Sequence, residues 1–309
     1  MPVTFRQLVE QFLAWSAHIL SPATVSYYRH HLNGFAAVAG DTPAAEVKRH
    51  VLLAWGTSWH RVQAVQRVYN WAVDDAELLD ANPFARVRRP PIGMRRRVLD
   101  RATLVRLMRG ASPSLRALLI ALRETMARPQ EVRALTWSCL TWPGQPNGFE
   151  AALWAGQVVA VLDEYKSRKR RLDPNAPRVI LISPRLGRLL GRLVCRTNDL
   201  VGRVFTNEHG KPWTGNAVRR AMRRLRLRLG LAVDHRGEPV VAYTIRHTQA
   251  TAASAAGIRD RVLAELMGHT SPRTTARYQH LDVRHLQEAM QILRRTRGPT
   301  RLDSAAARG

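Results

Sequence analysis

The sequence predicts a mainly α-helical protein with a small antiparallel β-sheet, arranged as a helical bundle followed by a mixed α+β domain. Apolar residues at helical spacing between capping motifs predict the bundle at residues 1–89. A basic, proline-containing linker is expected at residues 90–98. Helical segments interrupted by short apolar runs predict the mixed domain at residues 99–296, and residues 297–309 are expected to form a disordered tail.

Four amphipathic helices joined by short turns account for the predicted bundle. A capping box from Thr4 to Gln7 opens the first helix, whose predicted inner face consists of Phe5, Leu8, Phe12, Trp15 and Ile19. The second and third helices are expected to begin at Pro22 and Pro43, and the fourth to end at Asn82. The aromatic residues of these helices are more typical of a core than of a ligand-binding surface.

The mixed domain is expected to open with three helices, and the third begins at an arginine. Asp100 and Ser112 are the predicted N-caps of the first two helices. Arg128 precedes Pro129, and proline is favoured at the first helical position, so Arg128 is expected at a helix N-terminus. Backbone amides and the positive helix end attract a phosphate there, and a guanidinium adds two parallel donors.

Short apolar runs between charged turns predict strands at residues 151–154, 158–162 and 178–182. Lys166 and Lys169 lie in the basic stretch between the second and third runs. If these two runs pair as a hairpin, both lysines belong to its connecting turn.

The charge of the chain is strongly unbalanced. Its 309 residues include 49 lysines and arginines and 23 acidic residues, a net charge of +26. Residues 1–100 hold 12 basic and 8 acidic side chains, so residues 101–309 hold 37 and 15. A folded protein this basic usually has a polyanion as partner, and nucleic acid is the expected one, although a generally cationic surface without a specific partner is the alternative.

Composition also argues against several other classes of protein. Two cysteines, Cys139 and Cys195, form no disulfide framework and fit no metal-ligand spacing, which is typical of a reducing cytosol. We find no signal peptide, no apolar run long enough to span a membrane and no nucleotide-binding motif. We therefore expect a cytoplasmic protein without a metal, nucleotide or other cofactor.

Two segments concentrate the arginines. Residues 86–97 combine two prolines with six arginines, among them Arg95 and Arg96. Residues 211–230 hold seven basic side chains and no acidic one, and Val218, Met222, Leu225 and Leu229 predict an inward helix face. We expect DNA contacts from Arg95 and Arg96 and from four outward arginines: Arg219, Arg220, Arg223 and Arg224. The alternatives are a solvated helix for residues 211–230 and a charged tether for residues 86–97.

The segment from Leu266 to Leu281 carries the candidate chemistry. Gly268 is expected to end one helix and Pro272 to begin the next, which puts His269 in a tight exposed turn and Tyr278 one to two turns further on. A phenol and a histidine placed in this way can meet one small anionic group. On these residues alone, a packing tyrosine and a loop histidine would be the ordinary interpretation.

Other segments favour the chemical interpretation. Arg128, Lys166, Arg246, His269 and Tyr278, in this order and in these local contexts, resemble the tyrosine recombinase (phage integrase) family. The resemblance extends from about residue 4 to residue 280. It implies a SAM-like helical core-binding domain that grips one face of a DNA duplex, and a mixed α+β catalytic domain that grips the other.

The resemblance also implies a role for each residue. Tyr278 would be the nucleophile that forms a 3′-phosphotyrosine, Arg128 and Arg246 would hold the nonbridging phosphate oxygens, and His269 would add a hydrogen bond. Lys166 would protonate the leaving 5′ oxygen, with Lys169 as its rival. Glu131 would orient an arginine. The implied partners are double-stranded DNA and three further copies of the chain, in a tetramer on DNA.

Two positions depart from the family pattern. Tyr243 stands where the family usually has histidine in His-x-x-Arg-His, and Met126 or Ala127 stands where glycine is more common. A tyrosine hydroxyl still donates a hydrogen bond, but its pKa of about 10 makes it a poor proton shuttle near neutral pH. We expect Tyr243 to be a neutral donor in an active enzyme, and the alternative is a catalytically impaired DNA-binding relative.

Three other classes share part of the evidence. A type IB topoisomerase uses the same chemistry, but the N-terminal helical module and the chain length favour a recombinase. A regulator without catalysis would not need Tyr278 and both arginines, and a metal-dependent transposase would need a carboxylate triad that we do not recognise. The chain opens directly at the first predicted helix, so we expect no separate arm-binding domain.

Overall fold

The chain divides into two compact units, residues 1–94 and 95–309. The computed structural model describes residues 2–91, 96–142, 148–155, 157–165, 177–197, 201–231 and 233–269. At positions 150, 154, 155 and 195–197 only the backbone is described. The expected tail at residues 297–309 therefore lies outside the described residues.

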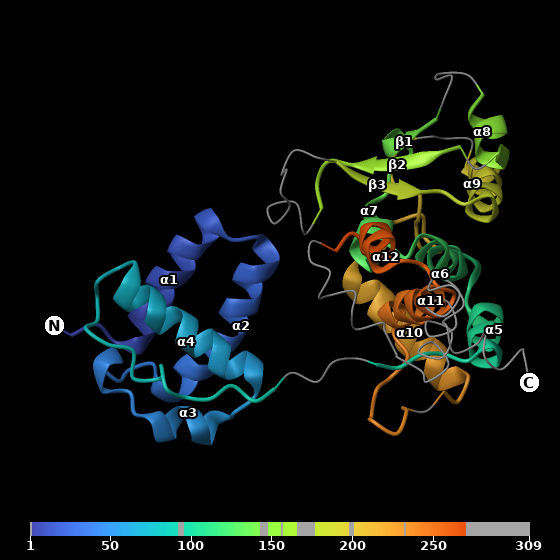
Figure 1. Cartoon of the computed structure of the whole chain (residues 1–309). Coiled ribbons are helices and arrows are strands. Elements are labelled where there is room, and N and C mark those ends of the chain that lie inside the picture. The colour runs from blue at the N-terminus through green and yellow to red at the C-terminus, as the bar shows by residue number, and fades with distance from the viewer. Residues whose placement is uncertain are drawn as a thin grey trace, which may run out of the picture. The chain divides into compact units, whose positions relative to one another are not determined.

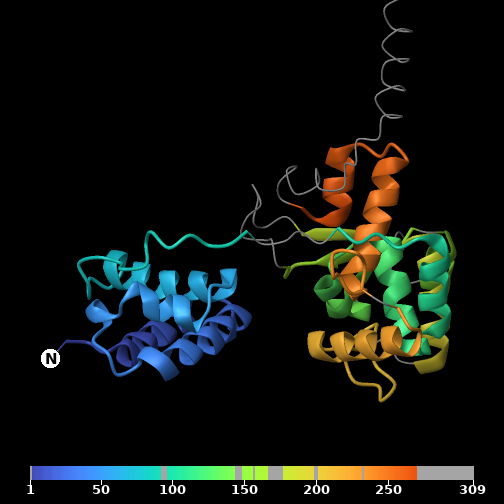
Figure 2. The same cartoon turned by 90° about the horizontal axis from the view of Figure 1, so that it is seen from below.

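The N-terminal unit is a helical bundle (Figures 1 and 2). Its elements are α1 (Phe5–Ile19), α2 (Pro22–Ala39), the short 3-10 helix η1 (Ala44–Glu46), α3 (Arg49–Trp55) and α4 (Trp59–Asp74). The predicted capping box is present: the Thr4 hydroxyl accepts from the Gln7 amide and the Gln7 side chain accepts from the Thr4 amide. α1, α2 and α4 enclose a core that includes Phe5, Phe12, Phe35 and Tyr69.

Three predictions for the bundle were wrong in detail. Ile19 is 55% exposed, because α1 ends there and its last turn extends beyond the core. Pro43 precedes only η1, and α3 starts separately at Arg49 after an extended Lys48. The fourth helix ends at Asp74 instead of Asn82.

The segment after α4 folds back along this helix, which explains its early end. The buried Gln66 amide donates to the carbonyls of Phe84 and Val87, both at 2.8 Å. The Asn82 side chain donates to Asn70 of α4 at 2.5 Å. Phe84 thereby enters the core, and Pro90 and Pro91 follow in irregular backbone, as the sequence predicted.

The second unit combines helices with a small antiparallel sheet (Figure 1). Its first part contains α5 (Arg101–Gly110), α6 (Pro113–Thr125), α7 (Pro129–Ala134), η2 (Trp137–Cys139), β1 (Leu140–Thr141), α8 (Phe149–Ala155), β2 (Val159–Leu162) and β3 (Arg178–Leu181). The remainder contains α9 (Pro184–Thr197), α10 (Gly215–Arg228), α11 (Ala242–Ala255) and α12 (Asp260–Met267). The predicted fold class, mainly helical with a small antiparallel sheet, is confirmed.

The sheet has the order β1-β2-β3, and both pairings are antiparallel. β2 and β3 confirm two of the predicted strands, and β1 was not predicted. Residues 151–154, predicted as a strand, belong to helix α8. The backbone of α8 approaches α9 at Gly187, where a Cβ atom would lie 2.2 Å from the Leu153 carbonyl oxygen, so helix packing decided the structure of this apolar run.

The predicted caps stand at their expected helix ends, and those at Asp100 and Gly268 form capping hydrogen bonds, whereas the Ser112 side chain forms none. The Asp100 carboxylate accepts from the Thr103 amide at 2.7 Å, and Ser112 precedes Pro113 at the start of α6. Gly268 ends α12 in the left-handed conformation, with φ +66° and ψ +38°. The amide of Gly268 donates to the Glu265 carbonyl and that of His269 to the Ala264 carbonyl, which is the Schellman arrangement.

Candidate active site

Helix α11 buries one of the two predicted catalytic arginines. Arg246 is fully buried, and its guanidinium donates to the carbonyls of Met126 at 2.6 Å and Met267 at 2.9 Å. It also lies 3.0 Å from Nε2 of His269. Because a guanidinium can only donate, this nitrogen of His269 is the acceptor. Arg246 thus joins α11, the turn after α6 and the end of α12.

Arg128 occupies the N-cap position of α7, as the sequence predicted. Its guanidinium donates to the Glu131 carboxylate at 2.7 Å and to the Gly268 carbonyl at 2.8 Å. The other Glu131 oxygen accepts from the Arg128 backbone amide at 3.0 Å. Glu131 is buried, and it holds Arg128 at both ends, which supports the orienting role expected for it.

A second fully buried arginine, Arg178, was not among the predicted site residues. It is 1% exposed and opens β3. Its guanidinium donates to the carbonyls of Glu265 at 2.8 Å and Leu266 at 2.5 Å, and Nε lies 3.8 Å from the Glu131 carboxylate. Burial lowers the pKa of Arg178 from its ordinary value, and the nearby Glu131 carboxylate opposes that shift.

Alternation along β3 was the signal that could have revealed Arg178. Residues 178–181 alternate between buried and exposed positions, and Arg178 shares the inward face with Ile180. An arginine on the apolar face of a strand needs several acceptors, because burying an unpaired charge is costly. That pattern predicts a buried partner, but not which one.

The C-terminus of α12 collects all three arginines. The carbonyls of four consecutive residues, 265 to 268, accept hydrogen bonds from Arg178, Arg246 and Arg128. The last carbonyls of a helix have no partner within it and carry the negative end of the helix dipole, so cations are stabilised there. Gly268 allows the close approach, since a Cβ atom would lie 2.7 Å from Nε of Arg178.

His269 was predicted in an exposed turn, and this prediction was wrong. The residue is 8% exposed. Its backbone amide donates a hydrogen bond to the Ala264 carbonyl, and its ring contacts Arg246. The buried arginines draw the turn inward, so that His269 and both predicted catalytic arginines lie in one cluster, which we call the arginine cluster: Arg128, Glu131, Arg178, Arg246 and His269.

The two departures from the family pattern lie beside this cluster. Tyr243 is 37% exposed, one helical turn before Arg246, whose Cζ lies 5.9 Å from the centroid of the tyrosine ring. Met126 has φ +51°, a left-handed conformation in which glycine costs less than methionine. The Met126 side chain is nevertheless buried in a small apolar cluster with residues of α11 and α12, such as Leu263.

Several predicted site residues lie outside the described residues: Lys166 and its rival Lys169, Tyr278, and Arg95 of the linker. The connection from β2 to β3 contains residue 166, and these strands are antiparallel neighbours. The role of each of these side chains remains a prediction.

The predicted DNA-contacting arginines of α10 are exposed and do not belong to the arginine cluster. They are Arg219, Arg220, Arg223 and Arg224. The opposite side of α10 is buried through Val218, Met222 and Leu225, as predicted. Arg96 is also exposed, and its backbone amide donates to the Glu238 carboxylate at 3.0 Å. The side chains of α10 thus form a positive face on this unit.

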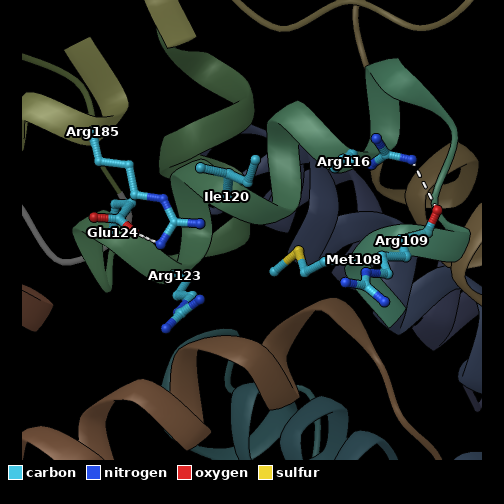
Figure 3. Close-up of a pocket in the computed structure, with 7 residues that line it drawn as sticks. All are labelled: Met108, Arg109, Arg116, Ile120, Arg123, Glu124 and Arg185. Carbon is cyan, nitrogen blue, oxygen red and sulfur yellow. Dashed lines mark hydrogen bonds and ion pairs between the residues drawn. The ribbon is translucent and has the colours of Figure 1, made fainter. Parts of the chain in front are cut away.

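A pocket between α5, α6 and the start of α9 is separate from the arginine cluster (Figure 3). Its lining comprises Met108, Arg109, Arg116, Ile120, Arg123, Glu124 and Arg185. Within it Arg185 pairs with Glu124 at 3.6 Å, and Arg116 donates to the Arg109 carbonyl at 2.9 Å. It contains none of the predicted catalytic residues.

Among the described residues, no group of three or more histidine, cysteine or acidic side chains is arranged to hold a metal ion. None of the helices within the described ranges combines the length and hydrophobicity needed to cross a bilayer.

Both a family model and individual relatives place this chain among the same proteins. The model of the phage integrase family matches residues 97–285. The tyrosine recombinase XerC of Thermodesulfovibrio yellowstonii is 34% identical over 85 residues, which are 28% of this chain and 27% of that protein. XerC of Rhodospirillum centenum is 34% identical over 83 residues, 27% of this chain and 23% of the relative. The matched part therefore spans about a quarter of these relatives.

Several solved structures with a similar fold are DNA complexes. A lambda integrase dimer bound to a COC′ core site has a TM-score of 0.69 at 16% identity and covers 89% of this chain and 77% of its own. The Tn1549 transposon integrase in complex with transposon right end DNA has a TM-score of 0.68 at 16% identity, over 94% of this chain and 99% of its own. A lambda integrase tetramer bound to a Holliday junction has a TM-score of 0.68 at 15% identity, and the match covers 91% of this chain and 81% of the lambda integrase chain. At these identities the likeness is one of fold.

Proposed function

The chain belongs to the phage integrase family, and from this premise we propose that it is a site-specific DNA recombinase that cuts and rejoins DNA through a 3′-phosphotyrosine intermediate. The observation that carries the proposal is the arginine cluster. Arg128, Arg246 and His269 come from three separate segments, and hydrogen bonds bring them to the end of α12. The chain continues from there to Tyr278, nine residues beyond His269.

The proposed first step is a transesterification. The Tyr278 hydroxyl releases its proton to water as its oxygen attacks the scissile phosphorus, the bond to the 5′ oxygen breaks, and Lys166 supplies the proton that makes the leaving group a hydroxyl. Arg128 and Arg246 offset the charge on the nonbridging oxygens in the transition state, with hydrogen bonds from His269 and Tyr243. One phosphodiester replaces another, so a 5′ hydroxyl of a second strand reverses the step.

The arginine cluster supports this chemistry through its rigidity. Its guanidiniums are held by backbone carbonyls and by Glu131, so they need little rearrangement when a phosphate arrives. Donors fixed in a buried site stabilise developing charge more than mobile donors in water do. The cluster is therefore suited to a transition state whose charge increases at one phosphate.

The proposed partner is double-stranded DNA, with four copies of the chain acting on two duplexes in the bacterial nucleoid. The exposed arginines of α10 supply sequence-independent attraction to phosphates. The solved structures of similar fold include a dimer on a core site and a tetramer on a Holliday junction, which supports the proposed assembly.

The test is covalent trapping on a nicked suicide duplex made from the DNA that flanks the gene. The wild-type chain is expected to give a DNA-linked band on a denaturing gel, because the nick releases the strand that would reverse the reaction. The band is expected to vanish in Tyr278→Phe and to weaken in Tyr243→Phe. A band that survives in Tyr278→Phe but is lost in Tyr243→Phe would show that Tyr278 is not the nucleophile.

A second candidate function is a catalytically impaired DNA-binding relative. The observation that favours it is Tyr243 at the position where histidine is usual. Tight DNA binding without a band, on a duplex whose recombination in cells has been demonstrated, would support this candidate. Recovery of the band in Tyr243→His would then identify the substituted position as its cause.

A further inference from the structure

We infer that Arg178 is a positioning residue for the proposed strand cleavage, one that locks the end of α12 and Glu131 to the base of the β2–β3 hairpin. The inference rests on the proposed function. Arg178 touches neither substrate nor Tyr278 in this account. It acts through the residues that it holds.

The contacts of Arg178 join three elements that carry predicted catalytic residues. Its own strand, β3, pairs with β2, and Arg178 lies opposite Leu162, four residues before Lys166. Its guanidinium reaches the α12 carbonyls of Glu265 and Leu266 and approaches Glu131, the partner of Arg128. A single buried side chain thus links the hairpin, α7 and α12.

Only an arginine provides this set of contacts. Its planar fork presents several donors in fixed directions, and one guanidinium nitrogen of Arg178 donates to both the Glu265 and the Val179 carbonyls. A lysine is a point charge on a flexible stem and cannot meet these acceptors together. Because Arg178 is 1% exposed, water cannot replace a lost contact.

Loss of these contacts is expected to act on His269 and Arg128. The carbonyls that Arg178 binds precede Gly268, whose own carbonyl binds Arg128, and His269, whose ring binds Arg246. If the end of α12 shifts, the cluster loses its arrangement around the phosphate. A displacement of about 1 Å in a catalytic group can lower a rate by about 100-fold.

The experiment compares Arg178→Met and Arg178→Lys with the wild type in single-turnover cleavage of the suicide duplex at saturating DNA. Arg178→Met is expected to lower the rate of adduct formation about 10- to 100-fold, with the DNA dissociation constant changed less than about 2-fold. Arg178→Lys is expected to recover part of the rate. The predicted signature is a loss in rate without a loss in affinity.

Arg133→Met is the matched control. Arg133 lies on α7, is partly buried and donates to the Trp213 carbonyl at 3.1 Å, but within the described part of the chain it forms no hydrogen bond to α12 or Glu131. Its substitution removes a carbonyl-bound arginine from the same unit and is expected to leave the rate within about 3-fold. An equal loss of rate in both methionine variants would overturn the inference, as would a rate in Arg178→Met within 3-fold of wild type.

The imidazole signals in nitrogen–proton NMR spectra supply a test that does not depend on cleavage. Arg178→Met is expected to shift or broaden the His269 signal, which Arg133→Met leaves in place. If the wild type forms no adduct, the proposed function fails while the NMR comparison still decides the role of Arg178. An unchanged His269 signal in Arg178→Met would contradict that role.

Discussion

The end of α12 and the outer face of α10 both depend on arginine but use it in different ways. At α12 the guanidiniums of Arg178 and Arg246 are buried and bonded to backbone carbonyls. On α10 Arg223 and Arg224 are exposed to water. A buried, fixed cation defines a position, whereas an exposed cation contributes to a field that salt screens. We therefore expect the first region to control the rate of chemistry and the second to control DNA affinity.

The largest effect is expected from Arg246→Lys. Lysine keeps the charge but cannot reach Met126, Met267 and His269 together. The rate of adduct formation at saturating DNA is expected to fall about 1000-fold, while the dissociation constant changes little. Arg220→Lys on the exposed face of α10 is the charge-matched control. A fall of less than 10-fold in Arg246→Lys would contradict a fixed, geometric role for Arg246.

The next effect is expected from Gly268→Ala, with Gly257→Ala as its control. Both glycines have positive φ, at +66° and +83°, so both substitutions incur a conformational cost of about 1–2 kcal/mol in unfolding free energy. Only at Gly268 would the new Cβ meet Arg178, at 2.7 Å, whereas nothing lies within 4 Å at Gly257.

Gly268→Ala should therefore lower the adduct rate about 100-fold, because the cluster must move to accommodate the methyl group. Gly257→Ala should leave the rate within a few-fold. Urea unfolding and single-turnover cleavage measured on both variants provide the comparison. Equal rates would show that α12 tolerates displacement of the guanidinium.

A smaller effect, and of a different kind, is expected from the double substitution of Arg223 and Arg224 by alanine. DNA affinity should fall about 10-fold near 0.1 M salt, and the slope of log affinity against log salt should decrease by about 2. The rate at saturating DNA should stay within 2-fold. The corresponding lysine pair should keep most of the salt slope, and a lysine pair as weak as the alanine pair would indicate shape-dependent contacts instead.

The smallest effect is expected from His31 in the N-terminal unit. Burial lowers the pKa of His31 from its ordinary value, and repulsion from His30, His60 and Arg61 adds to the shift. The unfolded chain then binds the proton more readily than the folded one. The contribution of neutral His31 to the free energy of unfolding should have its full value above pH 7.5. It should decline as the pH falls through about 6.5, the ordinary pKa of histidine.

His31→Gln removes this dependence. Thermal unfolding at pH 7.5 and 5.5 should show a smaller difference in melting temperature for His31→Gln than for wild type. His18→Gln, an exposed histidine at the end of α1, should leave the difference unchanged. The same pH dependence in wild type and His31→Gln would refute the assignment.

Local signals predicted the parts of the fold that depend on neighbouring residues. The capping box at Thr4, the N-cap at Asp100 and the helix end at Gly268 each rest on contacts within a few residues, and each is present in the structure. Arg128 at the start of α7 and the strands β2 and β3 were predicted in the same way.

The remainder depends on contacts between distant segments. Arg178 is buried because α12, 87 residues later, supplies the carbonyls that it needs. His269 was expected to be exposed because a glycine turn usually is, and Arg246 of α11 draws it inward. The sequence of residues 151–154 is typical of a strand, but these residues form a helix that packs against α9. A sequence pattern gives the local conformation, but not the partner that decides between two packings.

The most direct test of the difference between the two regions combines them in one chain. A triple variant with Arg178→Met, Arg223→Ala and Arg224→Ala would be measured for DNA affinity and for adduct rate at saturating DNA. If the regions act on separate steps, the triple variant should have the affinity of the α10 pair and the rate of Arg178→Met, each within about 2-fold. A rate well below that of Arg178→Met, or an affinity well below that of the α10 pair, would contradict the division of labour between buried and exposed arginines.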